Sequence, residues 1–328
     1  MTTVDITILS WDRLEDTKAA IASALTQTGV ELRVIVVDQG SKPESLNQLR
    51  AFCRQYPNVD LVCNVNNLGV PGGRNQAAFQ GNGDYIVALD NDAEFTDERQ
   101  IANAVEIMER QKDLAAIGFR ILRFGTRCED LSSWSYTQNA HEWGDKPFYT
   151  THFVGAGHMI RRSVFDQVNG YDDSLFFLQE EAELSRKLIN CGYKIRYSPE
   201  VVIGHKVAAE RRVNWNGPRW RFHVRNRFYM DVKFRTPFAS LCLSTLLTLY
   251  KGFRAGLILD STIGFMQGLS MLPQAIASWK LPGVSSTPAS KAYIASCSQN
   301  QGVSRWRRIR HRFKKAGVAP GQQAAESK

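Results

Sequence analysis

The sequence predicts an α/β fold: a mostly parallel sheet flanked by helices, followed by a C-terminal helical extension. Apolar runs typical of strands alternate with helix-like segments over the first ninety residues, and polar residues follow these runs. Such an alternation favours a parallel, doubly wound sheet. At 328 residues, of which 43% are hydrophobic, the chain is long enough for one large domain and a smaller addition.

The first ninety residues contain the clearest elements. Alternating or continuous apolar runs predict strands at 4–9, 32–37, 59–65 and 85–90. Apolar residues at helical spacing predict helices at 17–25, 44–56 and 73–80. Sheets of this kind bind ligands at the carboxyl ends of their strands, so the site is expected where these strands end.

The fourth predicted strand ends in two carboxylates, Asp90 and Asp92. Two charges about 5 Å apart repel by roughly 3 kcal/mol at an effective dielectric of about 20, and a divalent cation would remove this cost. Carboxylate oxygens suit Mg²⁺ or Mn²⁺, which often share their coordination sphere with substrate phosphates. The same residue types also form ordinary turns after strands, so the pattern alone leaves a structural role open.

Residues 66–75 form a glycine-rich segment, Asn-Asn-Leu-Gly-Val-Pro-Gly-Gly-Arg-Asn, just before the third predicted helix. Its glycines either make a tight turn or let backbone N–H groups approach an anion, with Arg74 available for a diphosphate or nucleobase. The segment matches neither G-x-G-x-x-G nor a Walker loop. This argues against a dinucleotide enzyme and against a P-loop nucleotidase.

Five motifs together resemble those of family 2 glycosyltransferases, which have the GT-A fold, a Rossmann-like architecture. The motifs occupy residues 36–41, 67–75, 89–92, 154–165 and 170–177. The likeness covers roughly residues 4–230. It is greatest to enzymes of the rhamnosyltransferase or polysaccharide-biosynthesis type.

The resemblance implies a set of site residues. Asp90 and Asp92 would hold Mg²⁺ or Mn²⁺, and His205 matches a position that can reach the metal or the diphosphate. The implied contacts with the nucleotide-sugar donor are Ser10, Asp38, Arg74, Asp90, Gly155 and Ala156. A single His also serves often as a buried structural residue, so this alternative stays open for His205.

The family has Glu-Asp at the start of a helix, with the Asp as catalytic base, and the matching residues here are Glu180 and Glu181. The resemblance therefore assigns the base to Glu181, although Glu is one methylene longer than Asp. An inverting transfer needs one carboxylate that takes the proton of the attacking hydroxyl. In the alternative interpretation these acids complement the helix dipole, and Glu183 pairs with Lys187.

Charge divides the chain unevenly. Residues 1–205 hold 20 basic and 28 acidic side chains, a net charge of −8, whereas residues 206–235 hold 9 and 2, a net charge of +7. Residues 305–315 add seven more Lys and Arg, interleaved with Trp and Phe. These basic segments favour anionic lipid headgroups over nucleic acid, with a disordered solubilising tail as the alternative.

Three segments are predicted along the chain: a catalytic domain at 1–235, an apolar helical extension at 236–280, and a linker with a basic tail at 281–328. The apolar run at 237–250 is shorter than the roughly 20 residues that span a bilayer. Two helices over 237–277 are therefore expected to lie against the catalytic domain or in the membrane interface. No signal peptide is predicted, and the six cysteines lack metal or disulfide spacing, which favours a cytoplasmic protein.

The sequence thus predicts an inverting, metal-dependent glycosyltransferase at the inner face of the cell membrane. It would use a UDP, dTDP or GDP sugar and extend a glycan or lipid-linked acceptor in bacterial polysaccharide biosynthesis, with no nucleic-acid partner. Two alternatives stay open. A sugar-nucleotide pyrophosphorylase would need a lysine-rich phosphate loop after the first strand, where Ser-Trp-Asp-Arg stands instead, and the other alternative is an inactive nucleotide-sugar binding protein of the same fold.

Overall fold

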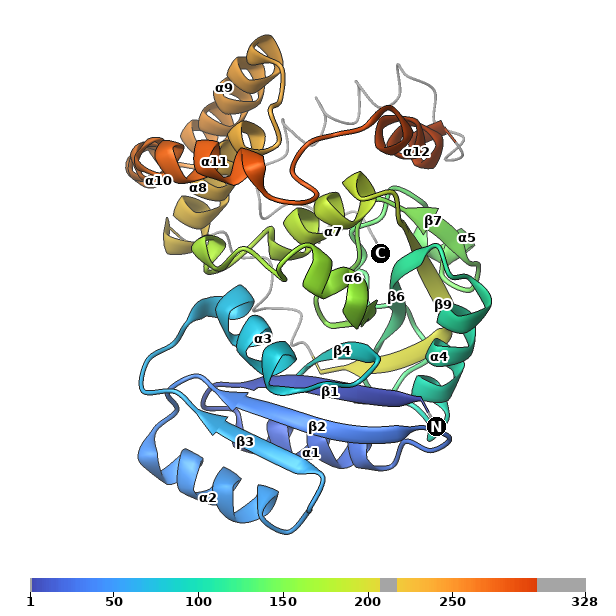
Figure 1. Ribbon diagram of the computed structural model, residues 1–328. Helices are drawn as coiled ribbons and strands as arrows, with labels where there is room; N and C mark the ends of the chain where they lie inside the picture. Colours follow the sequence, from blue (N-terminus) through green and yellow to red (C-terminus); the bar gives the residue numbers. More distant parts are fainter. Residues whose placement is uncertain (1, 207–216, 300–328) are drawn as a thin grey trace. The chain divides into compact units, whose positions relative to one another are not determined.

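The computed structural model describes residues 2–206 and 217–299 (Figure 1). The chain divides into two compact units, Met1–Val207 and Ala208–Lys328, which are described separately below. This division falls inside the predicted catalytic domain, and the predicted boundaries at 235 and 280 stay predictions. The predicted basic tail lies outside the described residues.

The first unit begins with a parallel half-sheet in the order β3-β2-β1-β4 (Figure 1). Its strands are β1 (Thr3–Ser10), β2 (Glu31–Asp38), β3 (Val59–Cys63) and β4 (Tyr85–Asp90). The connecting helices are α1 (Leu14–Leu25), α2 (Pro43–Cys53) and α3 (Gly69–Gln80). Each of these seven elements overlaps a predicted one, with different bounds at several ends.

Both faces of this half-sheet are buried, as expected for a doubly wound fold. Val34 and Val36 of β2 face the main core together with Ile21 of α1. Ile35 and Val37, which point to the opposite face because side chains alternate along a strand, pack with Ala77 of α3. The two-residue period therefore distributes apolar side chains to both layers of helices.

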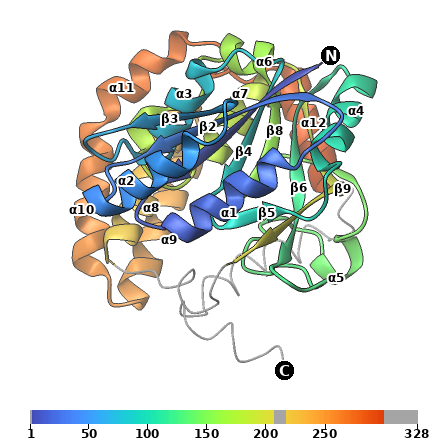
Figure 2. The same ribbon diagram turned by 90° about the horizontal axis from the view of Figure 1, so that it is seen from below.

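The second half of the sheet is mixed, and the whole sheet follows the order β3-β2-β1-β4-β8-β6-β9-β5 with β7 beside β9 (Figure 2). These strands are β5 (Ala93–Phe95), β6 (Leu114–Arg123), β7 (Phe148–Thr150), β8 (Gly157–Arg161) and β9 (Lys194–His205). Strand β8 runs antiparallel to β4 and β6. The helices here are α4 (Gln100–Arg110), α5 (Ala140–Trp143), α6 (Arg162–Gln167), η1 (Asp173–Leu175) and α7 (Glu180–Asn190). The α/β fold is thus confirmed, with parallel pairing dominant only in the N-terminal half.

Two elements are longer than predicted. The sequence predicts a strand only over 193–197, whereas strand β9 continues to His205, across a register shift opposite Phe119 and Arg120. The shift coincides with Pro199, which cannot donate to the ladder and hides the strand's continuity in the sequence.

Helix α3 also begins earlier than predicted, at Gly69 instead of residue 73. The Gly69 N–H donates to Oδ1 of Asn67 over 2.7 Å, and the Val70 N–H donates to the Phe176 carbonyl over 2.7 Å. A Cβ on Gly69 would lie 2.2 Å from that carbonyl oxygen. The glycine therefore permits close packing of the helix start, and these two N–H groups already have protein acceptors.

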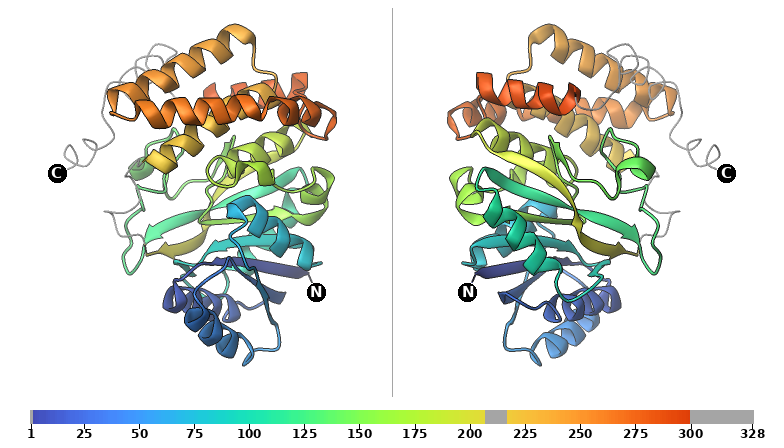
Figure 3. Two further views of the ribbon diagram at one scale, coloured as in Figure 1. Left: turned by 90° about the vertical axis from the view of Figure 1, so that its left-hand side faces the viewer. Right: turned by 90° about the vertical axis from the view of Figure 1, so that its right-hand side faces the viewer.

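The second unit is helical (Figure 3). It comprises α8 (Gly217–Lys233), α9 (Phe238–Arg254), α10 (Ile258–Ser270), α11 (Leu272–Ala277), η2 (Ser278–Lys280) and α12 (Pro288–Gln299). Two helices are predicted over 237–277, whereas the structure has three, because the second predicted helix is divided into α10 and α11. Gly256, with φ +72°, separates α9 from α10. Helix α12 lies within the segment predicted as a linker. In the described parts of the chain no helix has the length and apolar character to cross a bilayer.

Candidate active site

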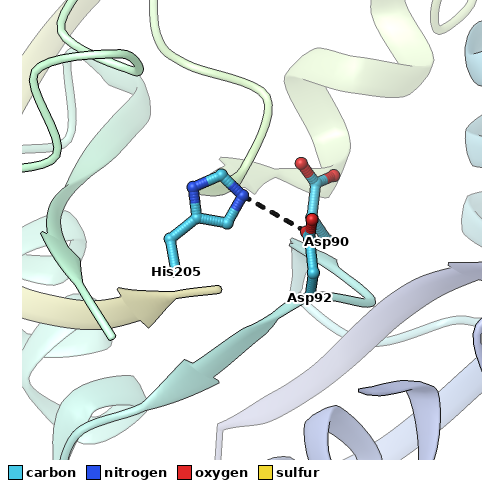
Figure 4. A group of neighbouring side chains, drawn as sticks. All are labelled: Asp90, Asp92 and His205. Atoms are coloured by element: carbon cyan, nitrogen blue, oxygen red, sulfur yellow. Dashed lines mark ion pairs between the residues drawn. The ribbon is translucent and has the colours of Figure 1, made fainter. Parts of the chain in front are cut away.

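Asp90, Asp92 and His205 lie together in the first unit (Figure 4). Asp90 ends β4 and His205 ends β9, so both follow the rule that sites form at the carboxyl ends of strands. The turn that carries Asp92 is held against β9, because Ala93 pairs with His205 and the Lys206 N–H donates to the Asp92 carbonyl over 2.8 Å. One ligand atom from each of the three side chains lies within 4.8 Å of the other two.

These three side chains fit a divalent cation. The Nε2 atom of His205 lies 3.2 Å from Oδ1 of Asp92. An octahedral ion with bonds of about 2.1 Å separates adjacent ligand atoms by about 3.0 Å, so the two atoms are spaced like neighbouring ligands. Two carboxylates with one imidazole form a donor set compatible with Mn²⁺ and Mg²⁺.

Arg13 contacts Asp92 on its other oxygen. Its Nη1 atom donates to Oδ2 over 2.6 Å. Burial disfavours the ionised form of Asp92, but the hydrogen bonds and charges of His205 and Arg13 outweigh burial and hold the pKa of this carboxyl well below its usual value. Asp92 is therefore ionised at neutral pH. Arg13 is not apparent from the sequence, because no local pattern links it to Asp92, which is 79 residues away.

Asp130 contacts the second ring nitrogen of His205. Its Oδ2 atom lies 2.9 Å from Nδ1. Asp130 belongs to the segment that follows β6, where the Ser133 N–H donates to the Asp130 carbonyl over 3.0 Å. No sequence pattern singles out Asp130, because Asp-Leu-Ser-Ser is typical of an ordinary turn.

Arg74 of α3 lies beside the end of β4 and is 5% exposed. Its Nη2 atom donates to Oδ1 of Asp90 over 3.0 Å and to the Gly155 carbonyl over 2.8 Å. Burial disfavours the charged guanidinium, but Tyr171 and nearby carboxylates, Asp90 among them, outweigh burial and raise the pKa of Arg74. Arg74 thus links α3, β4 and the segment before β8.

Glu181, in the first turn of α7, lies over the backbone of Gly155. A Cβ on Gly155 would stand 2.1 Å from Oε1 of Glu181 and 3.4 Å from Nη2 of Arg74. The next residue, Ala156, accepts a hydrogen bond from the Asp90 N–H over 3.0 Å. The backbone at 155–156 therefore contacts both Asp90 and Glu181, and the absence of a side chain at Gly155 leaves room for the Glu181 carboxylate.

The neighbouring acids of α7 have different surroundings. Glu180 is 4% exposed, and among the described residues its Oε2 atom has no hydrogen-bond partner. Burial, together with the charge of Glu181, raises the pKa of Glu180 to about 8. Glu183 is fully buried and lies 3.3 Å from Lys187, which is the predicted pair at helical spacing. Glu181 is only partly buried and is the more accessible acid of the first two.

Ser10 and Asp38 are neighbours in register at the ends of β1 and β2. Asp38 accepts hydrogen bonds from the N–H groups of Gly40 and Ser41 over 3.2 and 2.9 Å, and from the Ser41 hydroxyl over 2.5 Å. The Thr17 hydroxyl donates to Ser10 over 3.4 Å. Both predicted residues thus stabilise local turns, and their contact with a donor stays a prediction.

The chain resembles known proteins over much of its length. The model of glycosyl transferase family 2 matches residues 5–168. The Bacillus subtilis protein named "Probable glycosyltransferase YdaM" is 26% identical over 221 residues, which are 64% of this chain and 51% of the relative. The O-antigen chain rhamnosyltransferase RfbN of Salmonella typhimurium is 25% identical over 182 residues, which are 53% of this chain and 56% of the relative. The chain thus spans little more than half the length of these two relatives.

Solved structures share the GT-A fold at low sequence identity. A mannosyltransferase from Pyrobaculum calidifontis, in complex with GDP-Man and Mn²⁺, aligns with a TM-score of 0.54 and 14% identity, over 96% of this chain and 86% of its own. GalNAc-T7 with UDP, GalNAc and Mn²⁺ aligns with a TM-score of 0.58 and 16% identity, over 86% of this chain and 59% of its own. These likenesses confirm the predicted fold.

Proposed function

The chain belongs to glycosyl transferase family 2, and we propose that it is an inverting, metal-dependent enzyme that transfers a sugar from a nucleotide-diphospho sugar to a hydroxyl group. The observation that supports this most directly is the arrangement around residues 155–156. Asp90, with Asp92 and His205 close to it, contacts this backbone, and Glu181 lies against the same backbone at Gly155. Candidate metal ligands and a candidate base thus meet at one short segment.

In this proposal Asp90, Asp92 and His205 hold Mg²⁺ or Mn²⁺. Such an ion, when bound, neutralises the charge that develops on a departing diphosphate. The mannosyltransferase and GalNAc-T7 structures both contain Mn²⁺ together with a nucleotide or nucleotide sugar, which supports this assignment. Arg74 keeps the Asp90 carboxylate in place from the buried side.

Glu181 acts as the base. It takes the proton of the acceptor hydroxyl while the hydroxyl oxygen attacks the anomeric carbon on the face opposite the diphosphate. A new C–O bond forms, the C–O bond to the diphosphate breaks, and its electron pair leaves with the nucleoside diphosphate. Gly155 has no side chain to obstruct the carboxylate.

The donor is a UDP, dTDP or GDP sugar, and the acceptor is a glycan or a lipid-linked molecule of bacterial polysaccharide biosynthesis. Two relatives are O-antigen chain rhamnosyltransferases, which supports this role. The partial coverage of the relatives leaves their substrates as proposals for this chain.

We also propose that the protein lies peripherally at the cytoplasmic face of the membrane. Helix α9 contains no acidic residue, and Lys251 and Arg254 lie near its end. Its exposed apolar side chains are Phe238, Leu243, Leu246, Tyr250 and Phe253, each at least 50% exposed. Apolar residues next to cationic ones favour the interface of an anionic bilayer, where each basic residue adds on the order of 1 kcal/mol.

Nucleotide release tests the proposed reaction. Purified protein is incubated with UDP, dTDP or GDP sugars, Mn²⁺ and a candidate acceptor, and release of the nucleoside diphosphate is measured. A transferase releases the diphosphate and forms a glycosidic bond. Formation of pyrophosphate would instead identify a pyrophosphorylase, and donor binding without release would identify an inactive binding protein.

A further inference from the structure

We propose that Asp130 is a positioning residue that orients His205 towards the cation. The inference rests on the metal site of the proposed function. The two ring nitrogens of His205 face two different carboxylates: Nδ1 lies 2.9 Å from Oδ2 of Asp130, and Nε2 lies 3.2 Å from Oδ1 of Asp92. Asp130 thus contacts Nδ1, whereas Nε2 lies beside another candidate metal ligand.

The pairing determines which nitrogen carries the proton. A neutral imidazole has one N–H donor and one acceptor lone pair. When Nδ1–H donates to Asp130, the lone pair of Nε2 is left to coordinate a metal, as in carboxylate–histidine–metal triads. His205 is 1% exposed, so little solvent competes for either nitrogen. Its backbone is held by pairing with Ala93 and by a hydrogen bond from the Phe124 N–H over 3.0 Å.

Asp130 is itself held firmly. The Ser132 N–H and hydroxyl donate to Oδ1 over 3.0 and 2.5 Å, and the Ser133 hydroxyl donates to Oδ2 over 2.5 Å. The Asp130 N–H donates to the Ile121 carbonyl over 2.9 Å, which anchors the turn to β6. The acceptor for Nδ1–H is therefore fixed in position.

Asp130 could instead serve only the turn after β6. In that case its loss would change stability and leave the preference of His205 for the metal intact. The two roles differ in metal affinity and in the spectroscopic signature of histidine coordination, and neither readout depends on turnover.

The test compares Asp130→Ala and Asp130→Asn with the wild type in the full chain. Mn²⁺ affinity is measured by titration calorimetry, and pulsed EPR detects the ¹⁴N nucleus of an imidazole bound to Mn²⁺. We expect Asp130→Ala to weaken Mn²⁺ binding about 10–100-fold and to lose the ¹⁴N signal at saturating Mn²⁺, because outer-shell partners of a ligating His have effects of this size. Asp130→Asn keeps an acceptor oxygen and should show an intermediate loss.

Asp113→Asn is the matched control. This substitution also removes a carboxylate from the first unit. The Asp113 side chain is 51% exposed, and its Oδ2 atom lies 2.7 Å from Nζ of Lys194. Its Mn²⁺ affinity should equal that of the wild type. Thermal unfolding without metal separates any loss of fold from loss of binding, and if Asp130→Ala does not fold, Asp130→Asn alone decides.

The outcomes separate this inference from the proposed function. If Asp92→Ala abolishes Mn²⁺ binding while both Asp130 variants keep the wild-type affinity and ¹⁴N signal, the metal site stands and the positioning role is overturned. If the wild-type protein binds no Mn²⁺ and transfers sugar without it, the metal requirement fails, and the positioning role fails with it.

Discussion

The two units of the chain use their side chains in opposite ways. In the first unit most residues of the central strands β1 and β2 are buried, and Asp90, Asp92 and His205 each contact a defined partner. In the second unit, Gly252 is the buried residue of the seventeen-residue helix α9, and large apolar side chains of that helix are exposed. A fixed site needs packed surroundings, whereas the lipid-facing surface that we propose needs exposed apolar area.

The two regions also differ in net charge. Residues 1–205, with a net charge of −8, include the three candidate ligands for a cation, and residues 206–235, with a net charge of +7, follow directly in the chain. A carboxylate cluster attracts a divalent cation, and a cluster of Lys and Arg attracts anionic headgroups. The first unit is therefore expected to respond to loss of single side chains by loss of chemistry, and the second by loss of attachment.

The largest effect is expected from Asp92→Ala in the first unit. This substitution removes the candidate metal-binding carboxylate, which contacts both His205 and Arg13. Metal-dependent donor binding should therefore be lost, and transfer should fall by at least about 10²–10³-fold. Isothermal titration with Mn²⁺ and donor, together with the nucleotide-release assay, measures both losses. Wild-type activity in this variant would contradict the metal assignment.

Glu181→Gln should separate chemistry from binding. Loss of a general base lowers turnover by about 10²–10⁴-fold, while donor affinity should stay near the wild-type value. Single-turnover kinetics and donor titration measure the two quantities. Glu180→Gln is the matched control, since Glu180 is buried and should affect turnover much less. If the two variants exchanged behaviour, the base would be Glu180.

The double substitution Leu246→Asp and Phe253→Asp should act on attachment only. These side chains are 64% and 61% exposed, and burying a residue of this kind is worth about 1.5–3 kcal/mol. Partition onto anionic vesicles should therefore fall at least about tenfold, with turnover of a soluble acceptor unchanged. Val65→Asp, at a 92% exposed position of the first unit, is the control and should leave partition unchanged. Wild-type partition of the double variant would remove the contrast between the units.

Deletion of residues 305–328 tests the basic tail, which lies outside the described residues. The deletion removes seven clustered Lys and Arg and no candidate site residue, so turnover should change little while vesicle binding weakens. The deletion should remove the salt-sensitive part of the vesicle affinity, because salt screens charged contacts. The Debye length falls from about 10 Å at 0.1 M to about 3 Å at 1 M. Vesicle sedimentation over a salt series measures this. Unchanged affinity after the deletion would exclude the tail as an anchor.

The smallest effect on activity is expected at Glu180, whose ionisation makes the free energy of unfolding depend on pH. Its pKa is raised to about 8 in the folded protein, so the folded state holds a proton that the unfolded state releases above about pH 4.3. Stability should therefore fall as pH rises from about 4.5 to 8, and Glu180→Gln should flatten this slope. One pKa unit corresponds to about 1.4 kcal/mol, so a shift from about 4.3 to about 8 should make the variant more stable than the wild type at pH 8 by up to about 5 kcal/mol. Urea unfolding at pH 5 and pH 8 checks the sign.

The sequence reveals those parts of the fold that depend on local pattern. Strand β1 is predicted because its apolar residues alternate with polar ones, β2 and β4 are predicted from their apolar runs, and Asp90 and Asp92 are predicted because they follow such a run. The full length of β9 is hidden, because Ser198, Pro199 and Glu200 interrupt its apolar pattern.

Contacts between distant residues are beyond the reach of such patterns. Asp130 and His205 are 75 residues apart, and Arg13 and Asp92 are 79 residues apart. Neither pair has a local sequence signal, since each depends on which strands become neighbours. The antiparallel placement of β8 is hidden for the same reason.

The position of His205 at the very end of β9 has a consequence for how the protein is made. About 110 residues separate it from the two aspartates, and a ribosome that adds about 5–20 residues per second needs roughly 5–20 s to cover that interval. During synthesis Asp90 and Asp92 emerge without their third partner, whereas Arg13 has already been made and can pair with Asp92. A nascent chain that stalls before residue 205 would carry an incomplete ligand set, so tight capture of a cation would mark a fully translated first unit.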